Sequence, residues 1–487
     1  MSEPLSDPTF AARLTELAAT RPEQPAVTVG DITISFEQLE QRANRLARHL
    51  LDLGVAAGDF VTIAEPNSVE CVVASFACWK VGATPQPVSA RLPRLELDAL
   101  VELADPAVVI GAEVGDRPCL PLGFAPSDDL SNEPLDPAAV AAAWKAPTSG
   151  GSTGRPKLIV SGDPSVYHEG LIGLGATIGA EAGATTIMPG PLYHNGPFIW
   201  TYLSLLAGAH VEILPRFDAI ATLEAIERHR ARAIYLVPTM MQRIWKLPEE
   251  DRLAHDVSSL QVAFHLAEPC PPWLKEAWID WLGPEVIWEL YGGTEGQSFT
   301  VLNGQEWLDH RGSVGRPIVG EIGIRDEDGT PLPPGEVGDV WLRSTDRDTP
   351  TYRYVGAEAD ARDGGWECLG DMGWMDEDGY LYLADRRKDM ILVGGANIYP
   401  AEVESALNAH AAIASSAVIG LPDEERGNRI HALIEADPSA VDLDELKAFL
   451  GERLVSYKLP RTFEFVDEPV RDDAGKVRRG ALRDERL

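Results

Sequence analysis

Hydrophobic and polar positions alternate along the middle of the chain in a way that predicts a parallel sheet covered by helices. Between residues 184 and 292, short apolar runs end in Pro, Gly or polar residues, and stretches of helical period separate them. In open α/β sheets the ligand crevice lies outside the carboxyl ends of the strands, so we expect the loops after these runs to form the site. The runs are ATTIMP, HVEILP, AIYLVP, QVAFHLA and VIWELYG, and TLEAIERHR is a helical stretch between them.

An earlier segment, residues 35 to 54, has the pattern of an amphipathic helix. Its apolar residues recur at helical spacing, and Gly54 marks its end. We expect this apolar stripe to pack in the core rather than to form a site. The stripe consists of Phe36, Leu39, Ala43, Leu46, Ala47 and Leu50.

The pattern changes twice in the second half of the chain. From about residue 320, turn signals such as DEDG and PPGEVG between short strands predict an antiparallel subdomain. Near Arg386 the pattern of predicted helices and strands becomes that of a small α+β unit. The predicted fold class is therefore α/β. A large N-terminal domain with doubly wound sheets and the antiparallel subdomain spans residues 1–387, and a small mobile α+β domain spans residues 388–487.

The composition is that of a soluble protein of several structural units, with 487 residues, of which 45% are hydrophobic and 24% charged. No apolar run approaches the roughly 20 residues of a membrane-spanning helix, so we expect no membrane span. Neither end of the sequence carries a targeting signal, which makes a cytoplasmic location the default expectation. The net charge of -34 would repel nucleic acid, which proteins bind mainly through clustered Lys and Arg. A homodimer is left open.

Two residue classes refine this picture. The five cysteines lack metal-ligand spacing, and we expect all of them to be buried, reduced thiols: Cys71, Cys78, Cys119, Cys270 and Cys368. The last 35 residues are locally basic, and charge alone leaves open whether they form a solvated face or part of a site for anions. Their basic residues include Lys458, Arg461, Arg471, Lys476, Arg478, Arg479 and Arg483.

The segment TSGGSTGRPK, residues 148 to 157, has the composition of a phosphate-binding loop. Glycines let backbone N–H groups approach phosphate oxygens, hydroxyls donate hydrogen bonds, and a lysine adds positive charge. Its spacing differs from the GxxxxGK[ST] pattern of a P-loop, and composition alone leaves a flexible linker as the alternative. The predicted cradle comprises Ser149, Gly150, Gly151, Ser152, Thr153, Gly154 and Lys157.

This segment resembles the signature loop of the acyl-adenylating (AMP-forming) superfamily, which includes acyl-CoA synthetases, peptide-synthetase adenylation domains and luciferases. Five further blocks follow in family order, so the resemblance covers most of the chain and is strongest to the acyl-CoA synthetase branch. They are PLYHNGPF (191 to 198), YGGTEG (291 to 296), GSVGRP (312 to 317), LGDMGWMDEDGYLYLADRRKDMILVGGANIYPAEVE (369 to 404) and GKVRR (475 to 479). Two residues depart from the pattern. Gly150 stands where Ser or Thr is usual and Leu158 where Gly is common, which leaves the contacts of the cradle open.

The resemblance implies roles in binding ATP and Mg²⁺. Tyr291, next to Gly292, would stack on adenine, Thr294 would bond a phosphate, and Glu295 would ligate the magnesium ion. Asp371 and Arg386 match positions that bind the ribose or a phosphate. Taken singly, Tyr291 would be a packed aromatic, Glu295 a surface acid, and Asp371 and Arg386 halves of ordinary salt bridges.

The resemblance also implies a two-step mechanism with a moving small domain. Lys476 matches the lysine that bridges carboxylate and α-phosphate oxygens during adenylation, and Lys388 matches the hinge about which the domain rotates. In the second orientation, Gly394 and Gly395 would line the tunnel for the thiol of coenzyme A. Without the resemblance, Lys476 would be an exposed turn lysine and the glycine loop a plain strand turn.

The acid is predicted from the same blocks, and the acceptor from the eight residues after Arg479, which are too few for a fused carrier domain. His194 matches a position beside the acyl pocket, and no Asp that could bind a substrate ammonium occurs between Pro191 and Tyr202. Phe198, Ile199, Trp200 and Tyr202 are either apolar pocket walls or plain core. We therefore expect a hydrophobic acid, with a bile, steroid or fatty acid as the guess, and coenzyme A as the acceptor. The alternative is a stand-alone adenylating enzyme that loads a carrier protein. A luciferase lacks support here, and a nucleotide sensor would be expected to lack Lys476 or Glu295.

Overall fold

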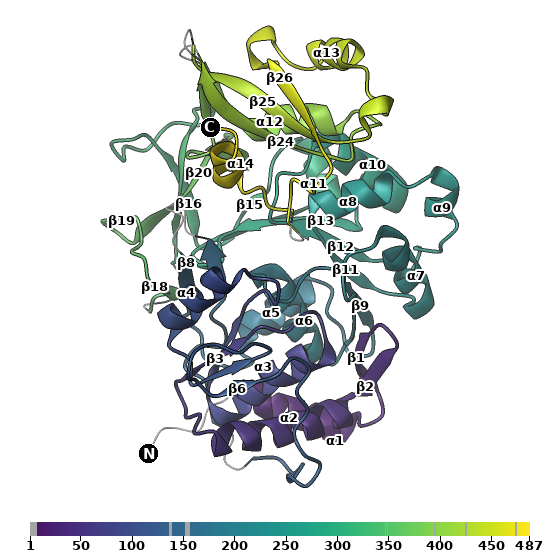
Figure 1. Cartoon of the computed structure of the whole chain (residues 1–487), viewed down its shortest axis with the longest axis vertical. Helices are drawn as coiled ribbons and strands as arrows, with labels where there is room; N and C mark the ends of the chain where they lie inside the picture. Colours follow the sequence, from purple (N-terminus) through teal and green to yellow (C-terminus); the bar gives the residue numbers. More distant parts are fainter. Residues whose placement is uncertain are drawn as a thin grey trace.

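The computed structural model describes residues 7–135, 139–150, 156–345, 347, 349–393, 396–423, 426–472 and 475–487, with only the backbone of Ser149 and Gly150. Figure 1 shows a large body of sheets and helices and, above it, a smaller unit formed by the C-terminal residues. The described chain thus confirms the predicted α/β fold class.

The largest sheet runs through the large body in the strand order β15, β14, β13, β12, β11, β9, β10, β1, β2. Neighbouring strands from β13 to β1 are parallel, and the strands at its two edges are antiparallel. The predicted apolar runs form its parallel centre. The bounds are β1 Pro25–Val29, β2 Ile32–Ser35, β9 Thr185–Met188, β10 His210–Ile213, β11 Ala233–Leu236, β12 Val262–Leu266, β13 Ile287–Gly292, β14 Phe299–Asn303 and β15 Arg316–Val319.

A second parallel sheet, in the order β4, β3, β5, β6, lies on the other side of a layer of helices. Its strands are β3 Phe60–Ile63, β4 Thr84–Pro87, β5 Val108–Ile110 and β6 Cys119–Leu120. The helices of the large body are α1 Phe10–Thr20, α2 Phe36–Asp52, α3 Val69–Val81, α4 Arg94–Ala104, α5 Glu169–Thr177, α6 Asn195–Ala207, α7 Ala219–His229, α8 Pro238–Trp245, α9 Glu249–Leu253, α10 Pro272–Leu282 and α11 Gly304–Asp309.

Helix α2 shows how sequence sets local structure here. Ser35 and Gln38 form a capping box at its start, which satisfies backbone N–H groups that have no partner within the helix. The predicted apolar stripe is buried along its whole length. The stripe is therefore core, as expected.

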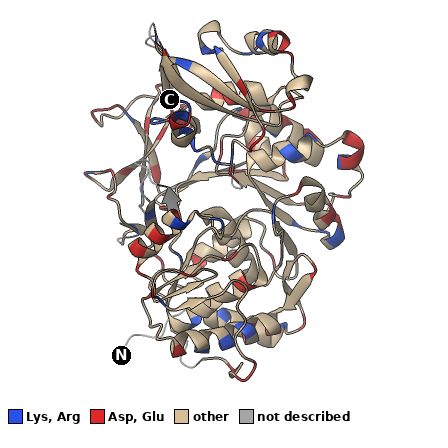
Figure 2. Cartoon of the chain, viewed as in Figure 1, with Lys and Arg blue, Asp and Glu red and all other residues tan. Residues whose placement is uncertain are grey.

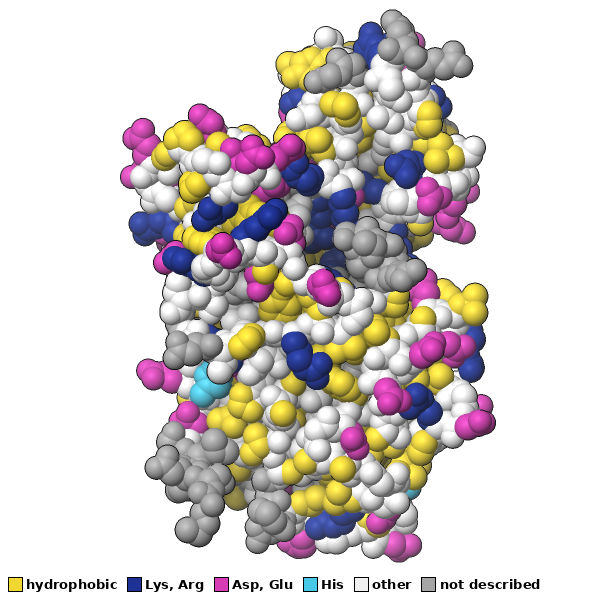
Figure 3. Space-filling model, turned by 90° about the vertical axis from the view of Figure 1, so that its left-hand side faces the viewer, with side chains coloured by type: hydrophobic (Ala, Val, Ile, Leu, Met, Phe, Trp, Pro, Cys, Tyr) yellow, Lys and Arg dark blue, Asp and Glu magenta, His cyan; other side chains and the backbone are white. Residues whose placement is uncertain are grey.

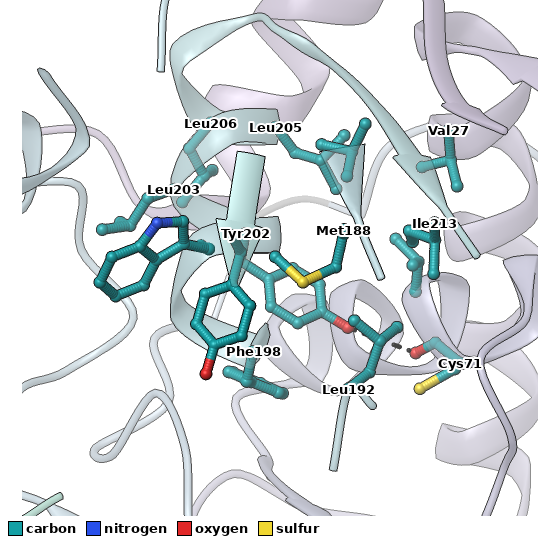
Figure 4. Packing of buried hydrophobic residues seen from close by; sticks show 14 of the residues in the cluster. Val27, Cys71, Met188, Leu192, Phe198, Tyr202, Leu203, Leu205, Leu206 and Ile213 are labelled. Carbon is teal, nitrogen blue, oxygen red and sulfur yellow. Dashed lines mark hydrogen bonds between the residues drawn. The ribbon is translucent and has the colours of Figure 1, made fainter. Parts of the chain in front are cut away.

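The main core lies between helices α3 and α6 and the sheets. Figure 4 shows Phe198, Tyr202 and Leu205 of α6 among Met188, Ile213 and Val27 of the large sheet. The Tyr202 hydroxyl is fully buried and donates to Ser75 Oγ at 2.6 Å. Burial of such large side chains stabilises each by about 2 to 3 kcal/mol, so this layer holds the sheet edges that carry the site.

Two antiparallel sheets follow, and the first of them is the antiparallel subdomain that the turn-rich sequence predicts. One has the order β16, β17, β20, β19, with β21 paired to β20, and the other has the order β18, β8, β7. The second sheet joins residues nearly 200 positions apart, because β18 pairs with β8. The bounds are β7 Thr148–Gly150, β8 Pro156–Ser161, β16 Glu321–Arg325, β17 Gly338–Arg343, β18 Tyr352–Val355, β19 Ala361–Arg362, β20 Trp366–Met375 and β21 Leu381–Arg386.

The small unit has a hydrophobic core of its own, built from residues between Ile391 and Leu454. A sheet in the order β24, β25, β26 packs against α12, and the hairpin of β22 and β23 lies beside it. The bounds are β22 Ile391–Val393, β23 Ala396–Ile398, α12 Pro400–Asn408, β24 Ser415–Asp423, β25 Gly427–Glu435, α13 Leu443–Gly451, β26 Thr462–Val466 and α14 Arg479–Asp484, with 3-10 turns at Pro438–Ala440 and Ser456–Lys458.

Charged residues are spread over many outer helices and loops, and acidic residues are evident on α9 (Figure 2). The basic residues of the C-terminal segment are largely paired: Arg461 with Asp423, Arg479 with Glu404, and Arg478 with Glu96 of α4. Among the described residues, no helix is both long and apolar enough to cross a bilayer.

One expectation about the cysteines is wrong. All five are free, but only Cys71 and Cys78 are buried, whereas Cys119, Cys270 and Cys368 are partly exposed. Cys71 and Cys78 face the core from helix α3, while Cys119 lies on the short strand β6 and Cys270 in the loop before α10. The apolar character of cysteine alone did not distinguish a buried helix face from a short strand or a loop.

Candidate active site

The loop that follows β13 brings Glu295 into the centre of the molecule. Glu295 is 7% exposed, and its Oε1 accepts a hydrogen bond from the Tyr354 hydroxyl at 2.5 Å. Lys157 Nζ lies 3.5 Å from the same oxygen and 3.8 Å from the centre of the Tyr354 ring. Thr294 precedes Glu295 in the turn, after Gly292 ends the strand. The predicted acid is therefore buried beside a lysine, not at the surface.

The predicted phosphate cradle is described only at its two ends. Strands β7 and β8 form an antiparallel hairpin in which Ser149 is opposite Lys157 and Gly150 opposite Pro156. Gly151, Ser152, Thr153 and Gly154 connect these strands and lie outside the described residues. The hairpin thus fixes Lys157 at the base of the loop, and the contacts of the loop itself stay a prediction.

Tyr291, Asp371 and Arg386 form one connected group. The Tyr291 hydroxyl donates to Asp371 Oδ2 at 2.8 Å, and Arg386 Nε lies 3.3 Å from Asp371 Oδ1. Asp371 and Arg386 are opposite each other on β20 and β21. Burial, reinforced by the negative charge of Asp371, raises the pKa of Tyr291, which therefore stays a neutral donor. Their predicted contacts with the nucleotide remain untested.

Lys476, from the small unit, faces this group across the cleft. Its pKa is lowered, first by burial and then by the charge of Arg386, while Asp472, Glu268 and Glu295 oppose the shift. The residue is nevertheless exposed to solvent. Figure 3 shows Lys and Arg side chains gathered in the recess below the small unit. A positive cleft thus exists within an acidic protein, as binding of anions requires.

His194 lies at the start of α6, near Lys476. Burial, with repulsion from the Lys476 ammonium, lowers the pKa of His194 to about 3, so the imidazole is neutral at physiological pH. Its Nε2 is buried and has no hydrogen-bond partner among the described residues. The ring packs against Tyr193 with centroids 4.4 Å apart and the ring planes tilted by 43°. A neutral, partly apolar surface therefore adjoins the charged cleft.

The aromatic residues after His194 have separate positions. Phe198 and Tyr202 pack against Trp79 within the core, so they do not line a pocket. Trp200 points elsewhere, and its ring lies 5.5 Å from that of Tyr235 and 5.4 Å from that of Phe264. For Phe198, Trp200 and Tyr202 the core alternative is correct, because each is at most 2% exposed, and successive positions of the buried helix face different neighbours.

The predicted hinge residue Lys388 lies in an exposed turn between β21 and β22. The surrounding protein partly desolvates the Lys388 ammonium and so lowers its pKa, and the charge of Arg386 acts in the same direction. Gly394 and Gly395, the predicted tunnel residues, lie outside the described residues. The turn is the connection between the two cores, and rotation about it stays a prediction.

The structure adds site residues that the sequence did not single out. Tyr354 reaches Glu295 because β18 pairs with β8, a pairing between distant segments that no local pattern reveals. Lys145 is 5% exposed, and burial lowers its pKa to about 8, although Asp163 and Glu295 oppose this. Glu268 follows strand β12. Its position after the carboxyl end of a parallel strand is the feature of the sequence that could have marked it as a site residue.

Comparison with known proteins identifies the family of the chain. Residues 14–347 match the model of the AMP-binding enzyme family, and residues 402–476 match that of the AMP-binding enzyme C-terminal domain. The chain is 32% identical over 484 residues to a feruloyl-CoA synthase of Amycolatopsis sp, with 96% of each chain covered.

Two further relatives are a CoA ligase matched by sequence and a solved structure. The chain is 32% identical over 511 residues, 95% of this chain and 96% of the other, to the 3-[(3aS,4S,7aS)-7a-methyl-1,5-dioxo-octahydro-1H-inden-4-yl]propanoyl:CoA ligase of Rhodococcus jostii (strain RHA1). It superposes on the o-succinylbenzoate CoA synthetase of Bacillus subtilis, in complex with its acyl-adenylate intermediate, with a TM-score of 0.79, 26% identity and 98% of both chains covered.

Fold, cleft and relatives together define an acid–thiol ligase of the AMP-forming acyl-CoA synthetase class. The chain belongs to the AMP-binding enzyme family.

Proposed function

We propose that this chain activates a hydrophobic carboxylic acid with ATP and Mg²⁺ and then transfers the acyl group to coenzyme A. In the first step a carboxylate oxygen bonds to the α-phosphorus and pyrophosphate leaves. In the second, the thiol sulfur attacks the acyl carbon and AMP leaves. The observation that carries the proposal is Lys476 of the small unit facing Glu295 and Arg386 of the large body.

The chemistry of the first step explains why such a lysine is needed. Two anionic groups must touch, and an ammonium in a cleft of reduced polarity stabilises the charge that they share in the transition state by several kcal/mol, roughly the contribution of one oriented donor. Lys157 and Arg386 supply further positive charge at the other edges of the cleft. We assign the phosphates to Lys157, the ribose to Asp371, and adenine to Tyr291.

Glu295 fits the requirements of a magnesium ligand. Both of its described polar contacts go to Oε1, so Oε2 has no described hydrogen bond or ion pair and remains an oxygen donor. No cluster of three or more potential metal ligands occurs among the described His, Cys, Asp and Glu residues. One carboxylate suits Mg²⁺, which takes waters and substrate phosphates as its other ligands. When bound, the ion would neutralise charge on the phosphates.

For the acid we propose a hydrophobic molecule, a bile or other steroid acid or a fatty acid. Neutral His194, beside the cleft, is the described surface that favours an apolar acyl group. The blocks SGGSTGRPK and PLYHNGPF resemble those of bile-acid and sterol-side-chain CoA ligases. The Rhodococcus relative is also named for a ring-bearing acid.

A panel of acids tests this proposal. The protein is incubated with ATP, Mg²⁺ and each acid, with and without coenzyme A, and pyrophosphate, AMP and thioester are measured. We expect pyrophosphate release only with an acid, and thioester only when coenzyme A is present. Release of ADP, or of pyrophosphate without any acid, would refute adenylation. Adenylation without thioester would instead favour a carrier protein as the acceptor.

A further inference from the structure

The end of helix α8 bonds directly to the small unit. Lys246, the residue that caps the carboxyl end of α8, donates from Nζ to the carbonyl oxygens of Asn408 at 2.9 Å, of His410 at 3.4 Å and of Ile413. Gln242, one turn earlier, donates from Nε2 to the Ala414 carbonyl at 2.8 Å. Two side chains of the large body thus hold the segment that links α12 to β24.

One acceptor of Lys246, the Asn408 carbonyl, lies at the carboxyl end of α12, and the carbonyls of His410 and Ile413 lie in the loop that follows it. Carbonyls at the carboxyl end of a helix have no partner within the helix, and the helix dipole places partial negative charge there. An ammonium with three N–H groups at the end of α12 matches both needs. Burial in this interface lowers the pKa of Lys246 to about 8, so its charge depends on these carbonyls for solvation. The contact is therefore specific to this arrangement of the two cores.

The start of α8 contacts the small unit through Glu268. Thr239 donates to Glu268 Oε2 at 2.8 Å, and Arg471 of the small unit lies 3.6 Å from the same oxygen. Arg471 also donates to Glu404 at 2.6 Å and to the Gly475 carbonyl at 2.9 Å. The turn that carries Lys476 is thus attached to the large body at one end of α8, while Lys246 holds the other end.

We propose that Lys246 is a positioning residue that holds the small domain in the orientation presenting Lys476 to the adenylation site. This inference rests on the proposed two-step function. Rotation of the small domain would strip the ammonium of its carbonyl partners, so Lys246 stabilises the adenylation orientation relative to the thioester-forming one. Gln242 acts in the same direction with a single uncharged hydrogen bond.

The rates of the two half-reactions measure the balance between the two orientations of the small domain. If the two orientations interconvert quickly, the ratio of the adenylation rate to the rate of thioester formation from supplied acyl-AMP follows their population ratio. Lys246→Met keeps the aliphatic chain and removes the ammonium, and we expect this ratio to fall about tenfold, as loss of charged hydrogen bonds implies. Gln242→Leu should lower it less. The matched control is Arg243→Met, on the exposed side of the same helix, which should leave the ratio unchanged.

An interdomain distance gives a readout that is independent of the chemistry. Fluorescent labels, introduced as non-natural amino acids because the chain has cysteines of its own, are placed at exposed Leu122 and Tyr457. Energy transfer should show Lys246→Met moving population away from the wild-type distance, and Arg243→Met not doing so. If Lys246→Met changes neither the distance nor the rate ratio, or if Arg243→Met changes them equally, the inference is wrong. A shifted distance without any adenylation would overturn the proposed function alone.

Discussion

At the scale of residues, the carboxylate of Glu295 interacts with several positive charges of the cleft. Lys157 is its ion-pair partner, and Lys145 and Lys476 interact with it electrostatically. Such an arrangement keeps the cleft stable while it is open to anions, because the lysines would otherwise repel one another. ATP with Mg²⁺ would then redistribute these charges toward its phosphates.

The neutral state of His194 leads to a prediction about acid stability. Its pKa is about 3 in the folded chain and near 6.5 in an unfolded one, so unfolding between these pH values takes up a proton. The contribution to stability is therefore lost as pH falls below about 6.5. His194→Gln should reduce the dependence of the free energy of unfolding on pH between pH 4 and 6 by about 1.4 kcal/mol per pH unit.

Urea denaturation at pH 4, 5 and 6 measures this slope, and the comparison at pH 8 gives the part of the substitution that does not depend on pH. An unchanged slope in the variant would mean that the imidazole is not held neutral in the folded protein.

At the scale of elements, the turn before Lys476 is built around Gly475. Its φ of 80° lies in the left-handed region, and a Cβ there would meet the Glu268 carboxylate, which Thr239 and Arg471 hold in place. Gly475→Ala adds backbone strain of about 1 kcal/mol to this collision, so we expect adenylation to slow about tenfold. Thioester formation from supplied acyl-AMP should change little.

The control for this turn is Gly480→Ala. A Cβ at Gly480 meets nothing within 4 Å, and the residue lies in α14, where alanine is favourable. Both half-reactions are measured in single-turnover experiments. Equal slowing by the two alanine variants would argue that the turn at Gly475 has no special fit.

Elements with a strong local pattern were predictable from the sequence, and contacts between distant elements were not. The apolar runs of β9 to β13 and the stripe of α2 are local signals, and they are where expected. The pairing of β18 with β8, which brings Tyr354 to Glu295, depends on tertiary packing. The contact of Lys246 with the end of α12 joins residues 162 to 167 positions apart, and nothing near Lys246 in the sequence marks it.

At the scale of the whole molecule, two separate cores are joined through the turn at Lys388. Rotation requires freedom of the backbone in this turn, and proline fixes φ. Lys388→Pro should therefore leave adenylation within about twofold, because the present orientation already presents Lys476, but slow thioester formation at least about tenfold. Lys388→Ala, which keeps backbone freedom, should behave nearly as the wild type. Loss of adenylation in the proline variant alone would place the hinge elsewhere.

The central claim is that Lys476 acts in adenylation and is absent from the second step. Lys476→Ala is compared with Lys447→Ala, an exposed lysine of the small domain paired with Asp444. Acyl-AMP formation and thioester formation from supplied acyl-AMP are measured separately for each. We predict that Lys476→Ala slows acyl-AMP formation about a hundredfold or more and leaves the second step within a few-fold of wild type, roughly the loss of one charge-stabilising donor. Equal losses in both steps would contradict the account.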